Sequence, residues 1–94
     1  MRQQNHKMFW VDLEMTGLDE TVDQILEVAV VVTDLDLIPV ESYHRIVFQP
    51  KEVLDRMNDW CKVTHGKSGL TSMVPKGVVL SVVEKELLEL AGRH

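Results

Sequence analysis

The apolar residues of the chain follow two different periods, and the change falls near residue 50. Before that point, short apolar runs of the kind that strands show are separated by polar segments at 17–23 and 34–39. Because both separating segments are short, consecutive strands should pair antiparallel, as in a meander. The pattern therefore predicts three strands, at residues 8–13, 24–33 and 43–49.

Two of these runs differ in how they alternate. Residues 8–11 (MFWV) are apolar at every position, which predicts a central strand covered on both faces. In the second run only the even positions are uniformly apolar, so one face of that strand should be buried. Those positions are Leu26, Val28, Val30 and Val32. Glu27 lies on its other face, either as a metal ligand or, more simply, as an acid paired with a nearby donor.

After residue 50 the spacing becomes helical. Pro50 can open a helix, since its missing N–H had no intrahelical partner. One apolar stripe follows at Val53, Leu54, Met57, Trp60 and Cys61, and residues 66–69 should break the helix. A second helix is predicted over 81–91, with a capping box from Ser81 to Glu84 and Gly92 as its C-terminal cap. Its buried face should comprise Val83, Leu87, Leu90 and Ala91.

Two carboxylates, Asp12 and Glu14, stand at the far end of the first strand. Their spacing of two places them on the same side of the strand, where they repel each other. A divalent cation with a preference for oxygen ligands, Mg²⁺ or Mn²⁺, would offset that repulsion. Gly17 then allows a sharp turn and a close ligand approach. Leu18, apolar and without an obvious partner, is free to face a ligand.

Composition narrows the class of protein. The chain of 94 residues is 45% hydrophobic, which predicts one small domain or part of a larger one. A net charge of −5 argues against a long basic track for nucleic acid, so any contact with RNA should be local and metal-centred. The single cysteine excludes an internal disulfide and favours a reducing, intracellular compartment. No apolar run reaches the length of a membrane span, and the polar leader 1–7 is too short for a signal peptide.

Two other motifs are rejected. Residues 66–68 (GKS) look like the end of a phosphate-binding P-loop, but that loop needs a glycine at the position of Cys61. The histidines and Cys61 are too scattered along the chain for a zinc site.

Five segments of the chain carry a family resemblance: residues 10–19 (WVDLEMTGLD), 23–29, 33–37, 54–61 (LDRMNDWC) and 65–70 (HGKSGL). Together they resemble oligoribonuclease, a 3′→5′ exoribonuclease of the DEDDh exonuclease group. Residues 10–19 resemble its first exonuclease motif. The resemblance implies an α/β, ribonuclease H-like exonuclease fold, truncated here to a three-stranded antiparallel meander plus two helices. Residues 1–94 would form a single, incomplete exonuclease domain.

The resemblance also implies roles for individual residues. Asp12 and Glu14 would be catalytic metal ligands for two Mg²⁺ or Mn²⁺ ions, and the substrate would be a short RNA oligonucleotide or dinucleotide. Residues matching Thr16, Gly17, Leu18, Trp60 and His65 would bind that substrate, with Leu18 as a wedge between the two bases. From the pattern alone, Trp60 is a core residue on its helix stripe, and His65, beside Gly66, is a solvated surface residue.

The later motifs of the family are absent. Residues 60–94 contain no aspartate, and no histidine is followed by an aspartate five positions on. We therefore expect the 94-residue chain to be inactive alone, as the first part of a homodimeric exonuclease. The alternative is a catalytically silent short form or remnant that acts only through association. The cytoplasm is the expected compartment, or the mitochondrion if the source is eukaryotic, which residues 60–61 and 67–71 favour.

Overall fold

The computed structural model describes residues 6–94 and places three strands in one antiparallel sheet. The strands are β1 (Met8–Met15), β2 (Ile25–Thr33) and β3 (Pro39–Ile46), in the order β1-β2-β3. The predicted meander is therefore confirmed. The third strand begins four residues earlier than predicted and ends at Ile46, and Val47 then makes a single parallel bridge to Val78.

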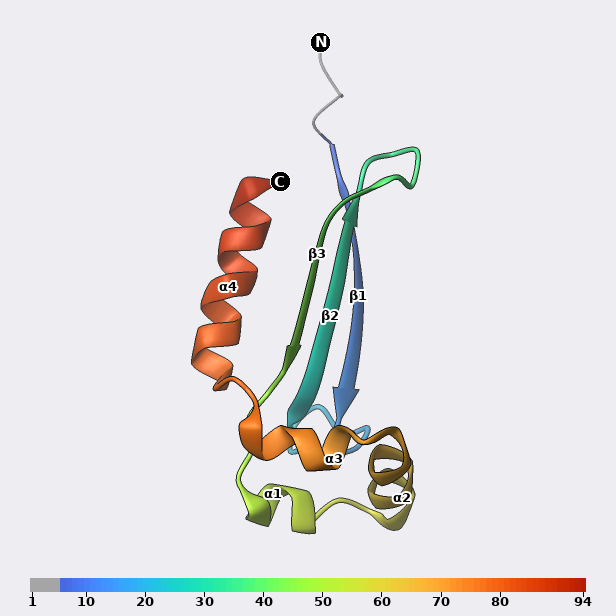
Figure 1. Ribbon diagram of the computed structural model, residues 1–94, viewed down its shortest axis with the longest axis vertical. Helices are drawn as coiled ribbons and strands as arrows, with labels where there is room; N and C mark the ends of the chain where they lie inside the picture. The colour runs from blue at the N-terminus through green and yellow to red at the C-terminus, as the bar shows by residue number, and fades with distance from the viewer. Residues whose placement is uncertain (1–5) are drawn as a thin grey trace.

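Helices cover one end and one face of this sheet (Figure 1). The helices are α1 (Lys51–Asp55), α2 (Asp59–Ser68), α3 (Leu70–Met73), the 3₁₀ turn η1 (Val74–Lys76) and α4 (Leu80–Arg93). The shorter elements before α4 gather at the end where β1 finishes, and the long helix α4 runs beside β3.

The core consists of two clusters that meet along β2. The first joins the even positions of β2 to the inner face of α4; its buried members are Val28, Val30, Val32, Val47, Val83 and Leu90. The second lies beneath the short helices and comprises Leu26, Met57, Cys61, Leu70 and Val74. The predicted alternation of β2 is confirmed, because its four even positions are at most 3% exposed.

Within residues 6–94, β1 is an edge strand and not the central strand that its apolar run predicted. In the described sheet it pairs with β2 alone, and its apolar residues are half-exposed. Phe9, Val11 and Leu13 line an apolar cavity of about 360 Å³ that they share with α4. The apolar run was correctly identified as a strand. Within residues 6–94, however, no strand pairs with the second hydrogen-bonding edge of β1, and the side chains of Phe9, Val11 and Leu13 remain partly exposed.

The single helix predicted from Pro50 is in fact two. The chain leaves the helical conformation at Asn58, whose φ of −68° and ψ of 167° are extended. The Asn58 side chain then caps α2 by accepting a hydrogen bond from Cys61 N at 2.8 Å. This restart resets the helical phase, so Trp60 turns away from the core, where the stripe had placed it, and is 70% exposed.

The ends of the later helices also differ from the prediction. Residues 66–68 remain in α2, which ends at Gly69 in the left-handed conformation with φ 83°. α4 begins one residue before Ser81, with Val79 as its N-cap and no side-chain cap, so the predicted capping box does not form. Gly92 lies inside α4, which continues to Arg93. Val83 and Leu90 are buried and Leu87 packs on them, whereas Ala91 is exposed.

Candidate functional site

Five of the seven predicted site residues line one cavity at the end of β1. Its volume is about 330 Å³. β1 contributes Leu13, Glu14 and Met15, and the following turn contributes Gly17, Leu18 and Glu20. α2 supplies the opposite wall with Trp60, Cys61 and His65. The cavity therefore joins residues about 50 positions apart in the sequence.

The two predicted metal ligands occupy one face of β1. In the antiparallel register Asp12 pairs with Ala29, and Glu14 lies directly opposite Glu27. Directly paired residues point to the same side of a sheet, so the three carboxylates share the face turned away from α4. Asp12 and Glu14 are both exposed, and only Glu14 reaches the cavity.

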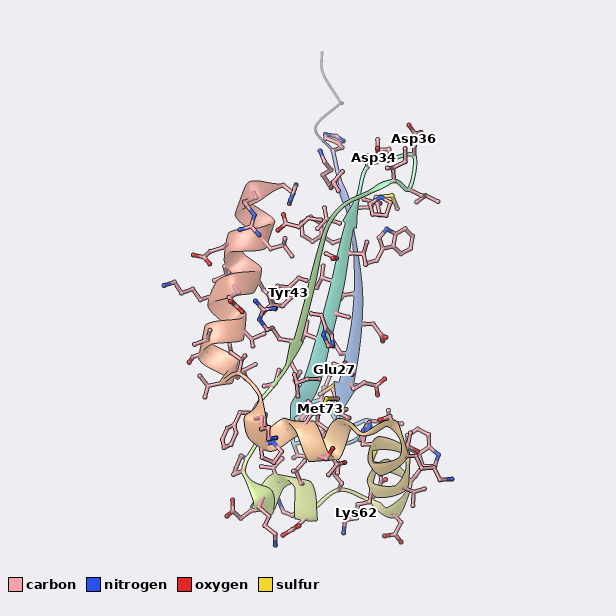
Figure 2. All side chains as sticks on the ribbon, in the orientation of Figure 1. Glu27, Asp34, Asp36, Tyr43, Lys62 and Met73 are labelled. Atoms are coloured by element: carbon pink, nitrogen blue, oxygen red, sulfur yellow. The ribbon has the colours of Figure 1, made fainter. Side chains whose placement is uncertain are left out.

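Glu27, which Figure 2 shows toward the end of the sheet beside the short helices, is paired with a cross-strand donor. His44 of β3 approaches its carboxylate through Nε2. This contact agrees with the simpler of its two predicted roles, an acid paired with a nearby donor. Within residues 6–94, no group of three or more His, Cys, Asp or Glu side chains is arranged to hold a metal ion.

Trp60 and Leu18 give the cavity its exposed apolar walls. Trp60 is 70% exposed on the first turn of α2, and Leu18 is fully exposed on the turn after β1. Neither side chain contributes to either core cluster. Large apolar groups left in water beside a concave surface are typical of binding sites.

His65 is buried, which contradicts the prediction of a solvated surface residue. Only 3% of the residue is exposed, and its Nε2 lies 2.9 Å from the carbonyl oxygen of Met15. The glycine beside His65 suggested exposure, but the imidazole points from α2 toward the end of β1. The two residues are 50 positions apart in the sequence, so no local sequence pattern predicts this contact.

Thr16 and Gly17 shape the turn between β1 and β2. Thr16 is buried outside the cavity lining, and its hydroxyl donates to Asp23 Oδ1 and accepts from Gln24 N, both at 2.9 Å. A Cβ on Gly17 would stand 2.4 Å from Asp23 Oδ2, so any larger residue here would have to displace that carboxylate. Asp23 is the residue that the sequence analysis missed; its spacing of four from Asp19 in a polar turn was the available signal.

Comparison with known proteins identifies the family. Residues 9–91 match the family model described as "Exonuclease". The chain is 55% identical over 84 residues to "Oligoribonuclease, mitochondrial" of Mus musculus, across 87% of this chain and 35% of that protein. It is 46% identical to "Probable oligoribonuclease" of Dictyostelium discoideum and 44% identical to "Oligoribonuclease" of Chromobacterium violaceum. Those two matches cover all of this chain and 50% and 53% of the relatives.

The chain belongs to the exonuclease family. Within that family its relatives are oligoribonucleases, so the resemblance inferred from the sequence is confirmed. The chain spans between a third and about half of the length of these curated relatives. No helix in the described part of the chain is long and apolar enough to cross a membrane.

Proposed function

We propose that this chain is the first, metal-binding part of a 3′→5′ exoribonuclease that degrades short RNA oligonucleotides and dinucleotides to mononucleotides. The cavity at the end of β1 supports this most, because it gathers Glu14, Leu18, Trp60 and His65. Its volume of about 330 Å³ lies at the low end of the range of about 300–1,000 Å³ for small-ligand sites. That size suits one or two nucleotides better than a long strand.

The walls of the cavity suggest how such a substrate would be held. Trp60 offers an exposed aromatic face on which a base can stack, and Leu18 offers an apolar surface on the other side. Stacking does not depend on base identity, so binding should tolerate many sequences. The net charge of −5 fits a short substrate, because a long one would need a basic track.

Divalent metal ions are general in the exonuclease family, and part of this chain fits them. Asp12 and Glu14 present hard oxygen donors on one exposed face, which suits Mg²⁺ or Mn²⁺. The chemistry that two such ions would supply when bound is activation of the attacking water and stabilisation of the leaving oxygen. We assign Asp12 and Glu14 as two of the ligands, and Glu14 joins their face to the cavity. The remaining ligands would come from outside the described residues.

We infer that residues 1–94 form one incomplete exonuclease domain and that the chain alone is inactive. The supporting facts are the family match over 9–91 and the much greater length of the relatives. A missing general base typically lowers a rate about 10²–10⁴-fold, and missing metal ligands lower it further.

The test is release of mononucleotides from a labelled RNA dinucleotide in the presence of Mn²⁺. The 94-residue chain should release none above background. In a protein that extends this chain to the length of its relatives, Asp12→Asn or Glu14→Gln should abolish release without altering thermal stability. Asp55→Asn is the matched control, since this acid is exposed on α1 and pairs with Lys51 of the same helix. Turnover by the 94-residue chain that disappears in Asp12→Asn would contradict the assignment of missing ligands.

A second candidate function is that of a silent short form that acts through association, and the edge of β1, which no strand pairs with inside residues 6–94, favours it. An edge strand with exposed apolar residues readily pairs with another chain. We propose a homodimer or larger species joined through this edge. Light scattering should show association that Val11→Lys abolishes, because Val11 is 60% exposed at the middle of β1. Val63→Lys on α2 should leave it unchanged, and a wild-type monomer at high concentration would refute the proposal.

The proposed location is intracellular and, in a eukaryote, mitochondrial. The relatives from Mus musculus and Homo sapiens have "mitochondrial" in their names. Fractionation of cells that express the protein with a fluorescent C-terminal tag tests this placement; recovery in the culture medium would contradict it.

A further inference from the structure

One carboxylate holds the turn that borders the cavity. Asp23 Oδ1 accepts a hydrogen bond from the Thr16 hydroxyl at 2.9 Å, and Asp23 Oδ2 accepts one from Asp19 N at 2.9 Å. The two donors stand on either side of Gly17 and Leu18. A single side chain therefore fixes both ends of the short segment between β1 and residue 19.

The base of the turn is closed around the same group. Thr16 N donates to Gln24 O at 2.9 Å, and Gln24 N donates to the Thr16 hydroxyl at the same distance. The Asp23 carboxylate occupies the space that a side chain at Gly17 would need, because a Cβ there would lie 2.4 Å from Asp23 Oδ2. The carboxylate consequently packs directly against the backbone that precedes Leu18.

Leu18 cannot fix its own position. Its side chain is fully exposed and belongs to neither core cluster, yet it lines the cavity opposite α2. An apolar group without packing partners can be placed only by the backbone that bears it. That backbone is held by Asp23, which does not itself line the cavity.

We propose that Asp23 is a positioning residue that presents Leu18 to the RNA-binding cavity, by fixing the turn from Thr16 to Asp19. The inference rests on the proposed function for the nature of the ligand. Its energetic meaning is preorganisation: a turn already in its bound geometry need not be ordered when the dinucleotide arrives. Asp23 acts through Leu18 and needs no contact with the substrate.

The experiment measures backbone order and dinucleotide binding in the 94-residue chain. In Asp23→Ala, NMR relaxation should show the order parameters of Gly17 and Leu18 falling from about 0.85 to below about 0.6. Asp23→Asn keeps one acceptor oxygen and should restore part of that order. Asp34→Ala is the matched control, because Asp34 holds the hairpin at the opposite end of the sheet (Figure 2) by accepting from Asp36 N and Ile38 N.

Binding of a fluorescent RNA dinucleotide gives the second measurement. Asp23→Ala should weaken it about 3–10-fold, the effect expected when one additional side chain must be ordered on binding. The double variant with Leu18→Ala should bind no more weakly than Leu18→Ala alone, since Asp23 acts through that residue. Asp34→Ala should bind like the wild type.

The outcomes separate this inference from the proposed function. A wild-type chain that binds no dinucleotide would count against the proposed function, and the NMR result alone would then decide whether Asp23 positions Leu18. Unchanged order at Gly17 and Leu18 in Asp23→Ala would overturn the inference. So would additive losses of binding in the double variant, because Asp23 would then act independently of Leu18.

Discussion

His65 Nε2 and the carbonyl oxygen of Met15 lie 2.9 Å apart, and this contact joins α2 to the end of β1. A carbonyl can only accept a hydrogen bond, so Nε2 must be the protonated nitrogen of the ring. The contact spans 50 residues of sequence. The contact therefore fixes the separation between α2, which carries Trp60, and β1, which carries Glu14.

Replacing His65 should therefore loosen the cavity as well as the fold. His65→Ala removes a buried ring and leaves the Met15 carbonyl without its partner, which should cost about 1–3 kcal/mol of unfolding free energy. Urea denaturation followed by circular dichroism measures the loss. His44→Ala serves as the control, because the His44 side chain is 57% exposed and should cost less than about 0.5 kcal/mol. Equal losses of unfolding free energy in the two variants would show that the His65 contact contributes no more stability than an exposed histidine does.

Two glycines should respond to alanine in opposite directions. Gly17→Ala brings a methyl group to 2.4 Å from the Asp23 carboxylate and should destabilise the fold by about 1–3 kcal/mol. Gly66→Ala lies within α2 with nothing inside 4 Å of the new methyl group, so it should stabilise the fold by about 0.5–1 kcal/mol. Thermal unfolding of both variants tests the pair, and a stabilising Gly17→Ala would refute the described turn.

Acid should weaken the contact between α4 and β3. Glu41 accepts hydrogen bonds from Arg93 at 2.7 Å and from His94 at 2.7 Å. The bond from Arg93, followed by that from His94, lowers the pKa of Glu41 from 4.5 to about 2. A lowered carboxylate pKa contributes stability above the unfolded value, and that stability is lost as the pH falls from 4.5 toward 2.

The matched variant for this pH dependence is Glu41→Gln, which cannot ionise. Its stability should fall less steeply than that of the wild type between pH 4.5 and 2, as followed by urea midpoints at each pH. Glu20→Gln provides the control, since Glu20 is an exposed acid at the opposite end of the sheet. Parallel pH profiles for the wild type and Glu41→Gln would show that the Glu41 contacts make no net contribution.

Trp60 should matter for binding and little for folding. With 70% of the residue exposed, Trp60→Ala should change the unfolding free energy by less than about 0.5 kcal/mol. Loss of a stacking platform should weaken dinucleotide binding by roughly 1–3 kcal/mol, or about 5–150-fold. Isothermal titration with an RNA dinucleotide measures the second effect. Val63→Ala, also exposed on α2, should change neither quantity, and a destabilised Trp60→Ala with normal binding would place Trp60 in the core after all.

The alternation of β2 was predictable because it is a local property of the strand. Its even positions had to face one core, and they do. The family resemblance likewise placed Trp60 and Leu18 at a pocket, and both line the cavity. A strand period is thus readable from sequence, whereas the binding roles of Trp60 and Leu18 remain predictions.

The errors arose where distant parts of the chain decide the outcome. An all-apolar run shows that both faces of β1 can be buried. It does not show that residues 6–94 contain a second strand to pair with β1 or enough structure to cover both faces. The stripe through Trp60 assumed a continuous helical phase, and the Asn58 cap resets it. His65 and Asp23 act through partners that are close in space, so their roles needed coordinates.

β2 contributes buried residues to both core clusters, and the described part of the chain divides into two packing units along this strand. Leu26 packs with the short helices around the cavity, whereas Val28 and the positions beyond it pack with α4. Damage in the α4 half, such as Leu90→Ala, can therefore raise amide exchange there while the cavity half keeps its protection. Binding and global stability are consequently separable quantities in this chain, and a variant that melts early can still hold its ligand.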